Sequence, residues 1–202
     1  MMNILNMRFH LHVHTTLSPC SRLRPAEILS DAKSKGLDGV CITDHNTMAV
    51  REILTEGLQE DGLCIIFGLE YSTADGDFLL FGPFEELPAG LSAPQLLDRV
   101  ENEGGVAIAA HPFRSARPTR EYLIKQGLCR IVEGVNGRNH THENDRVASW
   151  EKSYDIKQVG GSDAHSLSEL GQKATRFHTP ITSRADLIQA LKKGAFDIPH
   201  PN

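Results

Sequence analysis

The chain has 202 residues, of which 40% are hydrophobic and 23% are charged. This composition excludes a disordered chain, and the length suits a single domain over residues 1–202. The formal net charge of -5 argues against an extended nucleic-acid surface. Because no run approaches the roughly 18 apolar residues of a membrane span, we expect a cytoplasmic protein with no membrane partner.

Short apolar runs recur along the chain, with turn residues between them. They predict strands at Phe9–His14, Gly39–Thr43, Leu63–Gly68, Phe78–Gly82, Val106–His111, Ile131–Val135 and Ile156–Gly160. Most of the runs are continuously apolar rather than alternating. This pattern is typical of strands in a parallel sheet that helices cover on both faces.

Helical spacing and capping signals lie between these runs. Pro25 begins one predicted helix, Ser92 forms a capping box with Gln95 ahead of a second, and Ser183 caps a third that ends at Gly194. Further helices are expected near 48–61, 119–127 and 142–154. Repeated alternation of strand and helix within one small domain predicts an α/β fold and favours a (β/α) barrel over an open sheet.

Polar side chains follow almost every predicted strand. They are His12, His14, Asp44, His45, Glu70, His111, Asn136, Asp163 and His165. In a (β/α) barrel the carboxyl ends of the strands face one rim, so these side chains can meet there. Imidazoles and carboxylates are the usual ligands of zinc, manganese and iron, and we therefore expect a metal-dependent enzyme.

His12 and His14 are two residues apart on a strand, so they point to the same side and can bind one ion. His10 has the same spacing but lies deeper in the strand, which leaves its role open. Asp163 and His165 repeat the spacing after Gly160-Gly161, and Asp163 can bind metal or accept a proton from water.

Glu70 and His111 each end an apolar run. Glu70 follows Gly68, which permits close backbone approach, and its carboxylate can bridge two ions through its two oxygens. Either residue alone would more often be structural, His111 as a core histidine and Glu70 as a solvated carboxylate. Both residues nevertheless lie at the carboxyl ends of predicted strands, as the other polar clusters do, and this shared position favours metal binding for both.

The whole set of motifs resembles the polymerase and histidinol phosphatase (PHP) family. The motifs occur in the family's order over about residues 8–194 and comprise His12-Val13-His14-Thr15, Ile42-Thr43-Asp44-His45-Asn46, Gly68-Leu69-Glu70, His111-Pro112 and Gly161-Ser162-Asp163-Ala164-His165. The resemblance implies a distorted seven-stranded (β/α)7 barrel, similar to a TIM barrel, that hydrolyses phosphate esters.

The resemblance also implies two or three divalent ions, of manganese, iron or zinc. One ion would take His12, His14, Glu70 and Asp163, a second would share Glu70 with His111, and a third would take His45 and His165. Asp44 would orient a neighbouring ligand.

Three positions depart from the family pattern. His10 stands where many relatives begin the first motif with aspartate, and Phe78 stands where many have a histidine on the fourth strand, so the second ion would be weaker or differently held. Cys20 stands where some relatives have a histidine or aspartate for the third ion. Its thiolate would suit zinc or iron, but an isolated loop cysteine is also common without any ligand.

The resemblance implies that water attacks a small phosphorylated substrate such as a nucleotide, a sugar phosphate or a short oligonucleotide. Arg114, Asn136 and Arg138 lie in predicted rim loops and would bind that substrate. Asp163 would take the proton of the attacking water, and His178, downstream of the last predicted strand, would donate one to the leaving group.

Two other functions fit the same ligands. A carbon–nitrogen hydrolase could use the same ions, although such enzymes often carry a metal-bridging lysine on the fourth strand and Phe78–Gly82 contains none. A non-catalytic metal-binding module could keep the fold for partner binding. The residues do not determine the oligomeric state.

Overall fold

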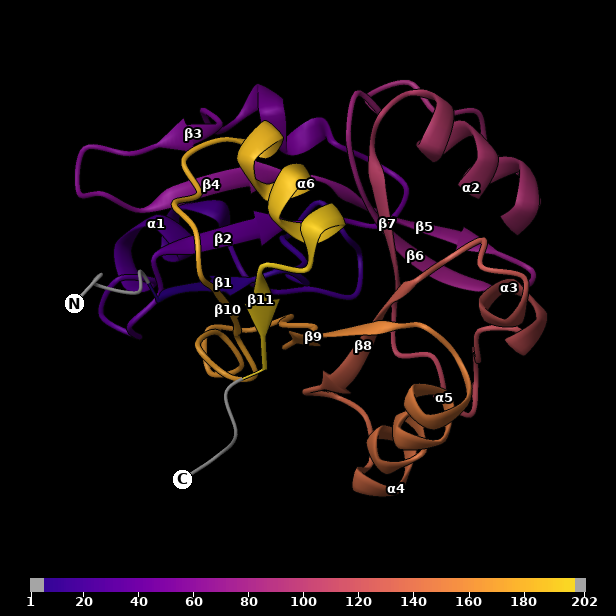
Figure 1. Ribbon diagram of the computed structural model, residues 1–202. Coiled ribbons are helices and arrows are strands. Elements are labelled where there is room, and N and C mark those ends of the chain that lie inside the picture. The colour runs from indigo at the N-terminus through magenta and orange to yellow at the C-terminus, as the bar shows by residue number, and fades with distance from the viewer. Residues whose placement is uncertain (1–5, 199–202) are drawn as a thin grey trace.

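The computed structural model describes residues 6–198, in which short strands and helices alternate (Figure 1). The elements in chain order are β1 (Met7–His10), α1 (Pro25–Asp31), β2 (Gly39–Ile42), the 3-10 helix η1 (Ala49–Glu52), β3 (Gly57–Leu58), β4 (Cys64–Phe67), β5 (Leu69–Thr73), β6 (Gly76–Phe81), α2 (Ala93–Asn102), β7 (Val106–Ala109), α3 (Glu121–Lys125), β8 (Ile131–Asn136), α4 (Thr141–Asp145), α5 (Val147–Ser153), β9 (Lys157–Gly161), β10 (Thr175–Phe177), α6 (Arg184–Lys193) and β11 (Phe196–Asp197).

The strands form two sheets, which confirms the α/β class but does not confirm a uniform (β/α)7 barrel. The sheet orders are β11-β10-β1-β2-β4-β3 and β5-β6-β7-β8-β9. Pairing is parallel for β1-β2-β4 and β7-β8-β9, as the apolar runs predict. It is antiparallel for β5-β6-β7, because β5 and β6 form a hairpin with no helix between them.

The two sheets meet at the carboxyl ends of their parallel strands. Gly68 alone separates β4 from β5, and a side chain there would come within 2.6 Å of the Leu80 carbonyl oxygen. Beyond the named strands, Val13 bridges to Ala164 and His45 bridges to Glu70, both in parallel orientation. These bridges draw the predicted ligand residues of both sheets to one rim.

The helices follow the capping signals where those signals are strong. Ser92 and Gln95 form the expected capping box of α2, and the Ser183 hydroxyl accepts a hydrogen bond from the Asp186 amide at the start of α6. Gly194 ends α6 with a φ of 72°. The predicted helix over 48–61 is wrong, because this segment contains only η1 and the edge strand β3.

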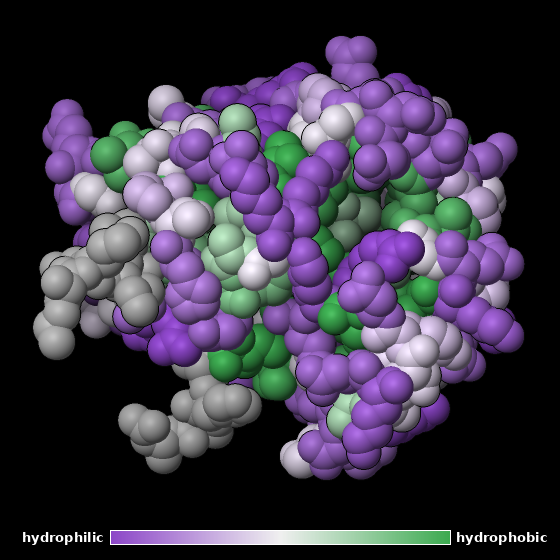
Figure 2. All heavy atoms as spheres, in the orientation of Figure 1, coloured by the Kyte–Doolittle hydropathy of each residue, from purple (hydrophilic) through white to green (hydrophobic). Residues whose placement is uncertain are grey.

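Both faces of the sheets are buried, as the continuous apolar runs predict. One core cluster joins strand side chains such as Ile42, Leu80 and Val132 to residues of helices α1, α2, α3 and α5. A second cluster joins the alternate side chains, such as Leu11, Ile66 and Ile108, to Leu187 and Leu191 of α6. The polar side chains in Figure 2 cover most of the face that carries α6, and apolar atoms show mainly between them.

Leu187→Ala is expected to lower the free energy of unfolding by about 2–5 kcal/mol, because the fully buried side chain leaves a cavity in the second cluster. Urea unfolding followed by circular dichroism measures the change. Leu58→Ala is the matched control, since Leu58 is 57% exposed on β3. Equal midpoints for the two variants would show that α6 does not complete this core.

No helix within residues 6–198 is long and apolar enough to cross a membrane.

Candidate metal centre

The segments after β1 and β9 run side by side and present their polar side chains together. The His14 amide donates to the Ala164 carbonyl at 2.9 Å, and the Ala164 amide donates to the His12 carbonyl at 3.2 Å. Asp163 has a φ of 54°, a left-handed conformation that is uncommon for residues other than glycine. This conformation lets Asp163 Oδ1 face the Nε2 atoms of His12 and His14.

Four predicted ligand atoms converge in this place. The Nε2 atoms of His12 and His14 are 3.0 Å apart. Glu70 Oε2 lies 3.5 and 3.2 Å from these two nitrogens, and Asp163 Oδ1 lies 3.5 and 3.4 Å from them. Ligands held about 2.0–2.2 Å from a tetrahedral ion are about 3.4 Å from one another, so the spacing fits a divalent ion.

Glu70 joins this group to a second one. Its Oε2 atom is buried and makes no hydrogen bond within the described residues, whereas Oε1 lies 2.9 Å from His111 Nε2. Asp77 Oδ2 lies 3.9 Å from the same nitrogen. Glu70, Asp77 and His111 could therefore hold a cation with ligand atoms within 4.8 Å of one another. Asp77 was not predicted as a ligand from the sequence.

A third group contains His14, His45 and His165. The His14 ring lies between the other two, with centroid distances of 4.3 Å to His45 and 4.4 Å to His165. His45 Nδ1 lies 2.9 Å from Glu70 Oε2, so this group also adjoins the first. Burial and the neighbouring His14 lower the pKa of His165 to about 4, so its imidazole is neutral and able to bind metal at neutral pH.

A buried carboxylate behind His12 is the main site residue that we did not predict. Glu133 Oε1 lies 2.8 Å from His12 Nδ1, and Oε2 accepts hydrogen bonds from the His111 amide and the Asn136 side chain, both at 2.8 Å. Gly161 makes room for this carboxylate, since an added Cβ would collide with Glu133 Oε1. Such a contact fixes the tautomer and the ring orientation of a metal-binding histidine.

His14 is oriented from the other side. The Ser18 hydroxyl lies 3.3 Å from His14 Nδ1 and donates to Asp44 Oδ1 at 2.6 Å. The amide and hydroxyl of Thr15 also donate to Asp44, each at 2.7 Å. These contacts agree with the orienting role expected of Asp44.

The electrostatics of the first group favour a bound cation. Burial opposes ionisation of Glu70, but His12 and the hydrogen bonds from histidines outweigh it and hold the pKa of Glu70 well below its usual range. Asp163 has a lowered pKa for similar reasons. Burial disfavours the charged form of His12, yet the adjacent carboxylates raise its pKa well above the ordinary value. The carboxylates therefore stay ionised, and a bound cation can replace the proton on His12 as the positive charge between them.

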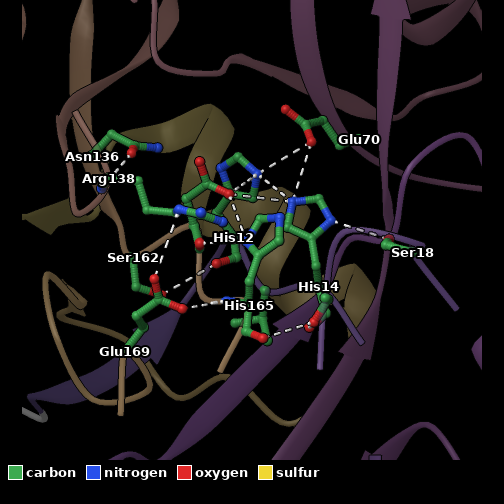
Figure 3. A network of polar contacts seen from close by, with 12 residues as sticks. His12, His14, Ser18, Glu70, Asn136, Arg138, Ser162, His165 and Glu169 are labelled. Atoms are coloured by element: carbon green, nitrogen blue, oxygen red, sulfur yellow. Dashed lines mark hydrogen bonds and ion pairs between the residues drawn. The ribbon is translucent and has the colours of Figure 1, made fainter. Parts of the chain in front are cut away.

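The predicted substrate-binding residues line the rim. Arg114 Nη2 donates to Asp163 Oδ2 at 2.7 Å and to Asn136 Oδ1 at 2.9 Å. Arg138 is exposed on the loop after β8, with its Nε 3.7 Å from Glu169. All three predicted residues are thus near Asp163 or the loop that carries His165. Figure 3 shows Asn136 and Arg138 on the side of the centre where Glu169 and His165 lie.

Two predicted site residues are not brought into these groups. Cys20 is exposed on the loop after β1, and partial burial raises the pKa of its thiol. His178 lies on the β10–β11 hairpin, with Nε2 3.1 Å from Asp197. Because β10 runs antiparallel to β1 and Phe177 pairs with Met7, His178 lies at the amino end of β1, opposite the rim.

His10 is also outside the three groups. Its side chain is fully buried in β1, two residues before His12, and its Nδ1 atom lies 2.9 Å from the Ser162 hydroxyl.

Sequence comparison relates the chain to archaeal proteins and to one family profile. A family described as PHP-associated matches residues 141–196. The uncharacterized protein MJ1587 of Methanocaldococcus jannaschii is 35% identical over 164 residues, which cover 76% of this chain and 94% of that protein. MJ0417 of the same organism is 30% identical over 181 residues, covering 85% and 70% of the two chains.

Solved structures share the fold at low identity. PsfC from Pseudomonas syringae has a TM-score of 0.78 at 20% identity, covering 98% of this chain and 92% of its own. A two-domain protein from Bacteroides vulgatus, containing a predicted PHP-like metal-dependent phosphoesterase, has a TM-score of 0.73 at 16% identity, covering 96% and 64%. Endonuclease Q, in complex with a 27-mer duplex substrate, has a TM-score of 0.73 at 18% identity, covering 96% and 58%.

The structure of Endonuclease Q corrects one expectation. The net charge led us to expect no extended nucleic-acid surface, and the resemblance led us to expect a small phosphorylated substrate. This expectation about partners is wrong, because a protein of the same fold holds duplex DNA with an abasic lesion at its active site. Local charge, rather than the sum over the chain, meets the phosphates of a nucleic acid. Here, Arg114, Arg117 and Arg120 lie between β7 and α3, and Arg138 lies in the loop after β8.

Proposed function

Because the chain belongs to the PHP family, we propose that it is a metal-dependent phosphoesterase. The observation that carries this proposal is the convergence of four ligand atoms, from His12, His14, Glu70 and Asp163, at separations of 3.0–3.5 Å. The segments that carry these four side chains are far apart in the chain, and packing of the apolar core does not by itself bring polar side chains together. Binding of a divalent ion explains their convergence.

The chain's residues divide into three ligand sets in this proposal. The first is His12, His14, Glu70 and Asp163; the second shares Glu70 with His111; the third contains His45 and His165. Cys20, exposed on the loop after β1 and outside these groups in the structure, is the proposed thiolate ligand of the third ion. When bound, manganese, iron or zinc would activate water and neutralise the charge of a phosphate. A distorted seven-stranded barrel, supported by the Val13–Ala164 bridge and the short step from β4 to β5, would hold these sets at one rim.

Residues around the ligands would handle the substrate and the proton. Asp163 is the proposed proton acceptor for the attacking water, and Arg114 keeps it oriented through the 2.7 Å contact with Oδ2. Arg138 and Asn136 are the proposed phosphate contacts, since a guanidinium can bind two phosphate oxygens at once.

A nucleic-acid phosphodiester is the substrate class that we propose to test first. The arginine-bearing loops after β7 and β8 adjoin the centre, with Arg114 on Asp163 and Arg117 on Asp77. Endonuclease Q, of the same fold, acts on such a substrate. Binding to phosphates through several arginines would weaken steeply with added salt.

Turnover assays with the manganese-, iron- and zinc-loaded protein test the proposal. We expect hydrolysis of bis-p-nitrophenyl phosphate and of labelled DNA oligonucleotides, single-stranded or duplex, with Asp163→Asn as the inactive control. Amide substrates included in the same panel would identify a carbon–nitrogen hydrolase. Metal binding without turnover of any phosphate ester would instead favour a non-catalytic module.

A further inference from the structure

Asp77 lies beside the ligand sets because of the direction of its strand. β6 runs antiparallel to β7, with Phe78 opposite Ala109, and the Ala110 amide donates to the Asp77 carbonyl at 2.9 Å. The start of β6 therefore lies at the rim where β7 ends. Asp77 is thus placed next to His111 although it precedes its own apolar run.

The side chains of Glu70, Asp77 and His111 form a closed group at this point. All three residues are at most 3% exposed, and their ligand atoms lie within 4.8 Å of one another. Glu70 presents Oε1 to His111, while its Oε2, which has no hydrogen-bond partner within residues 6–198, faces the first ligand set. Two buried carboxylates around one imidazole are costly unless a positive charge joins them.

One positive charge reaches this group from the surface. Arg117 Nη2 donates to Asp77 Oδ1 at 2.7 Å, and the arginine side chain is half exposed. Its loop is held against the β5–β6 turn, because the Arg120 amide donates to the Asp75 carbonyl at 2.8 Å. Gly76 allows this approach, since a side chain there would come within 2.9 Å of Thr119 Cα.

We propose that Asp77 is a ligand of a second divalent cation, together with Glu70 and His111. Arg117 competes with this cation for the Asp77 carboxylate. Asp77, which precedes Phe78, supplies a ligand where the phenyl side chain of Phe78 cannot. When the cation binds Asp77, Arg117 is freed to meet a phosphate at the rim, so occupancy of the site and the charge offered to substrate are coupled. The inference rests on the metal centre of the proposed function and not on the phosphoesterase reaction.

Titration of chelator-treated protein with Mn²⁺ tests this inference, with calorimetry for affinity and electron paramagnetic resonance for the number of ions bound. We expect at least two sites in the wild type. Asp77→Asn should weaken one of them by at least about tenfold, since even outer contacts to metal ligands are worth about 10–100-fold. Arg117→Gln should tighten that site by about two- to fivefold, the range of an exposed ion pair.

The two changes should not be independent. In the Asp77→Asn background, Arg117→Gln should leave Mn²⁺ affinity unchanged, because the shared carboxylate is gone. Asp75→Asn, on the neighbouring turn and outside the group, is the matched control and should bind Mn²⁺ like the wild type.

Each outcome bears on a different claim. Wild-type affinity and stoichiometry in Asp77→Asn would overturn the inference and leave the rest of the metal centre standing. A wild-type protein that binds no Mn²⁺ would overturn the proposed function as well. If Asp77→Asn does not fold, Arg117→Gln still tests the inference, because Arg117 is at the surface and its replacement preserves the core. An unchanged Mn²⁺ affinity in Arg117→Gln would refute competition between Arg117 and the cation.

Discussion

Glu70→Gln is expected to lower phosphoesterase turnover by about 10³-fold or more, because metal ions contribute several kcal/mol to stabilising the reacting phosphate and each 1.36 kcal/mol is a factor of ten. Glu70 offers Oε1 to His111 and Oε2 to His12, His14 and His45, so it is shared by all three groups. Glutamine has the same shape but lacks the charge. The bound ions should fall by at least one per chain in elemental analysis.

A matched change away from the centre separates the loss of a ligand from a general effect of losing charge. Glu101→Gln removes one carboxylate from the exposed surface of α2 and should leave both metal content and turnover unchanged. If Glu70→Gln retained full metal content and activity, the carboxylate would not be shared between ions, and the proposed centre would have to be abandoned.

Glu133→Gln is expected to reduce both Mn²⁺ affinity and kcat/KM by about 10–100-fold, the usual cost of losing a partner behind a metal-binding histidine. Glutamine has only one acceptor oxygen, whereas Glu133 accepts at both: Oε1 faces His12 Nδ1, and Oε2 accepts from the His111 amide and the Asn136 side chain. In the variant an NH2 group must face His12 Nδ1 or those two donors, so the support behind His12 is weakened. His12 would then be free to turn or change tautomer. Calorimetric titration with Mn²⁺ and steady-state kinetics measure the two effects.

A second variant tests the same positioning role without touching a charge. Gly161→Ala should displace the Glu133 carboxylate, because the added Cβ would collide with Oε1, and should reproduce the loss of metal affinity. The absorption spectrum of the cobalt-loaded protein reports the geometry around the ion. A merely structural role for Glu133 would lower stability in both variants but leave that spectrum as in the wild type.

The proposed ligand set is largely predictable because most of its members follow parallel strands. The segments after β1, β2, β7 and β9 supply His12, His14, His45, His111, Asp163 and His165, and parallel strands end at one edge. Spacing of two residues correctly pairs His12 with His14, whose Nε2 atoms are 3.0 Å apart. Each of these statements needs only strand direction and periodicity.

Three residues show where this reasoning fails. Asp77 begins β6 rather than ending it, and only the antiparallel pairing brings it to the rim. His178 follows β10, whose reversed direction carries it to the opposite end. Glu133 lies within the apolar strand β8 and was not predicted as a site residue. Its position in an apolar run could have indicated a paired carboxylate, because a glutamate is seldom fully buried unless it is paired.

The sequence by itself determined the α/β class, seven of the strands and the residue types of the candidate metal centre, because periodicity and ligand chemistry are local properties. The tertiary structure alone decided which strands reverse, which carboxylate stands behind His12, and how Glu70 divides its two oxygens between neighbouring groups. These depend on contacts between segments far apart in the chain, such as the contact between His12 and Glu133, which are 121 residues apart, and no local pattern encodes them.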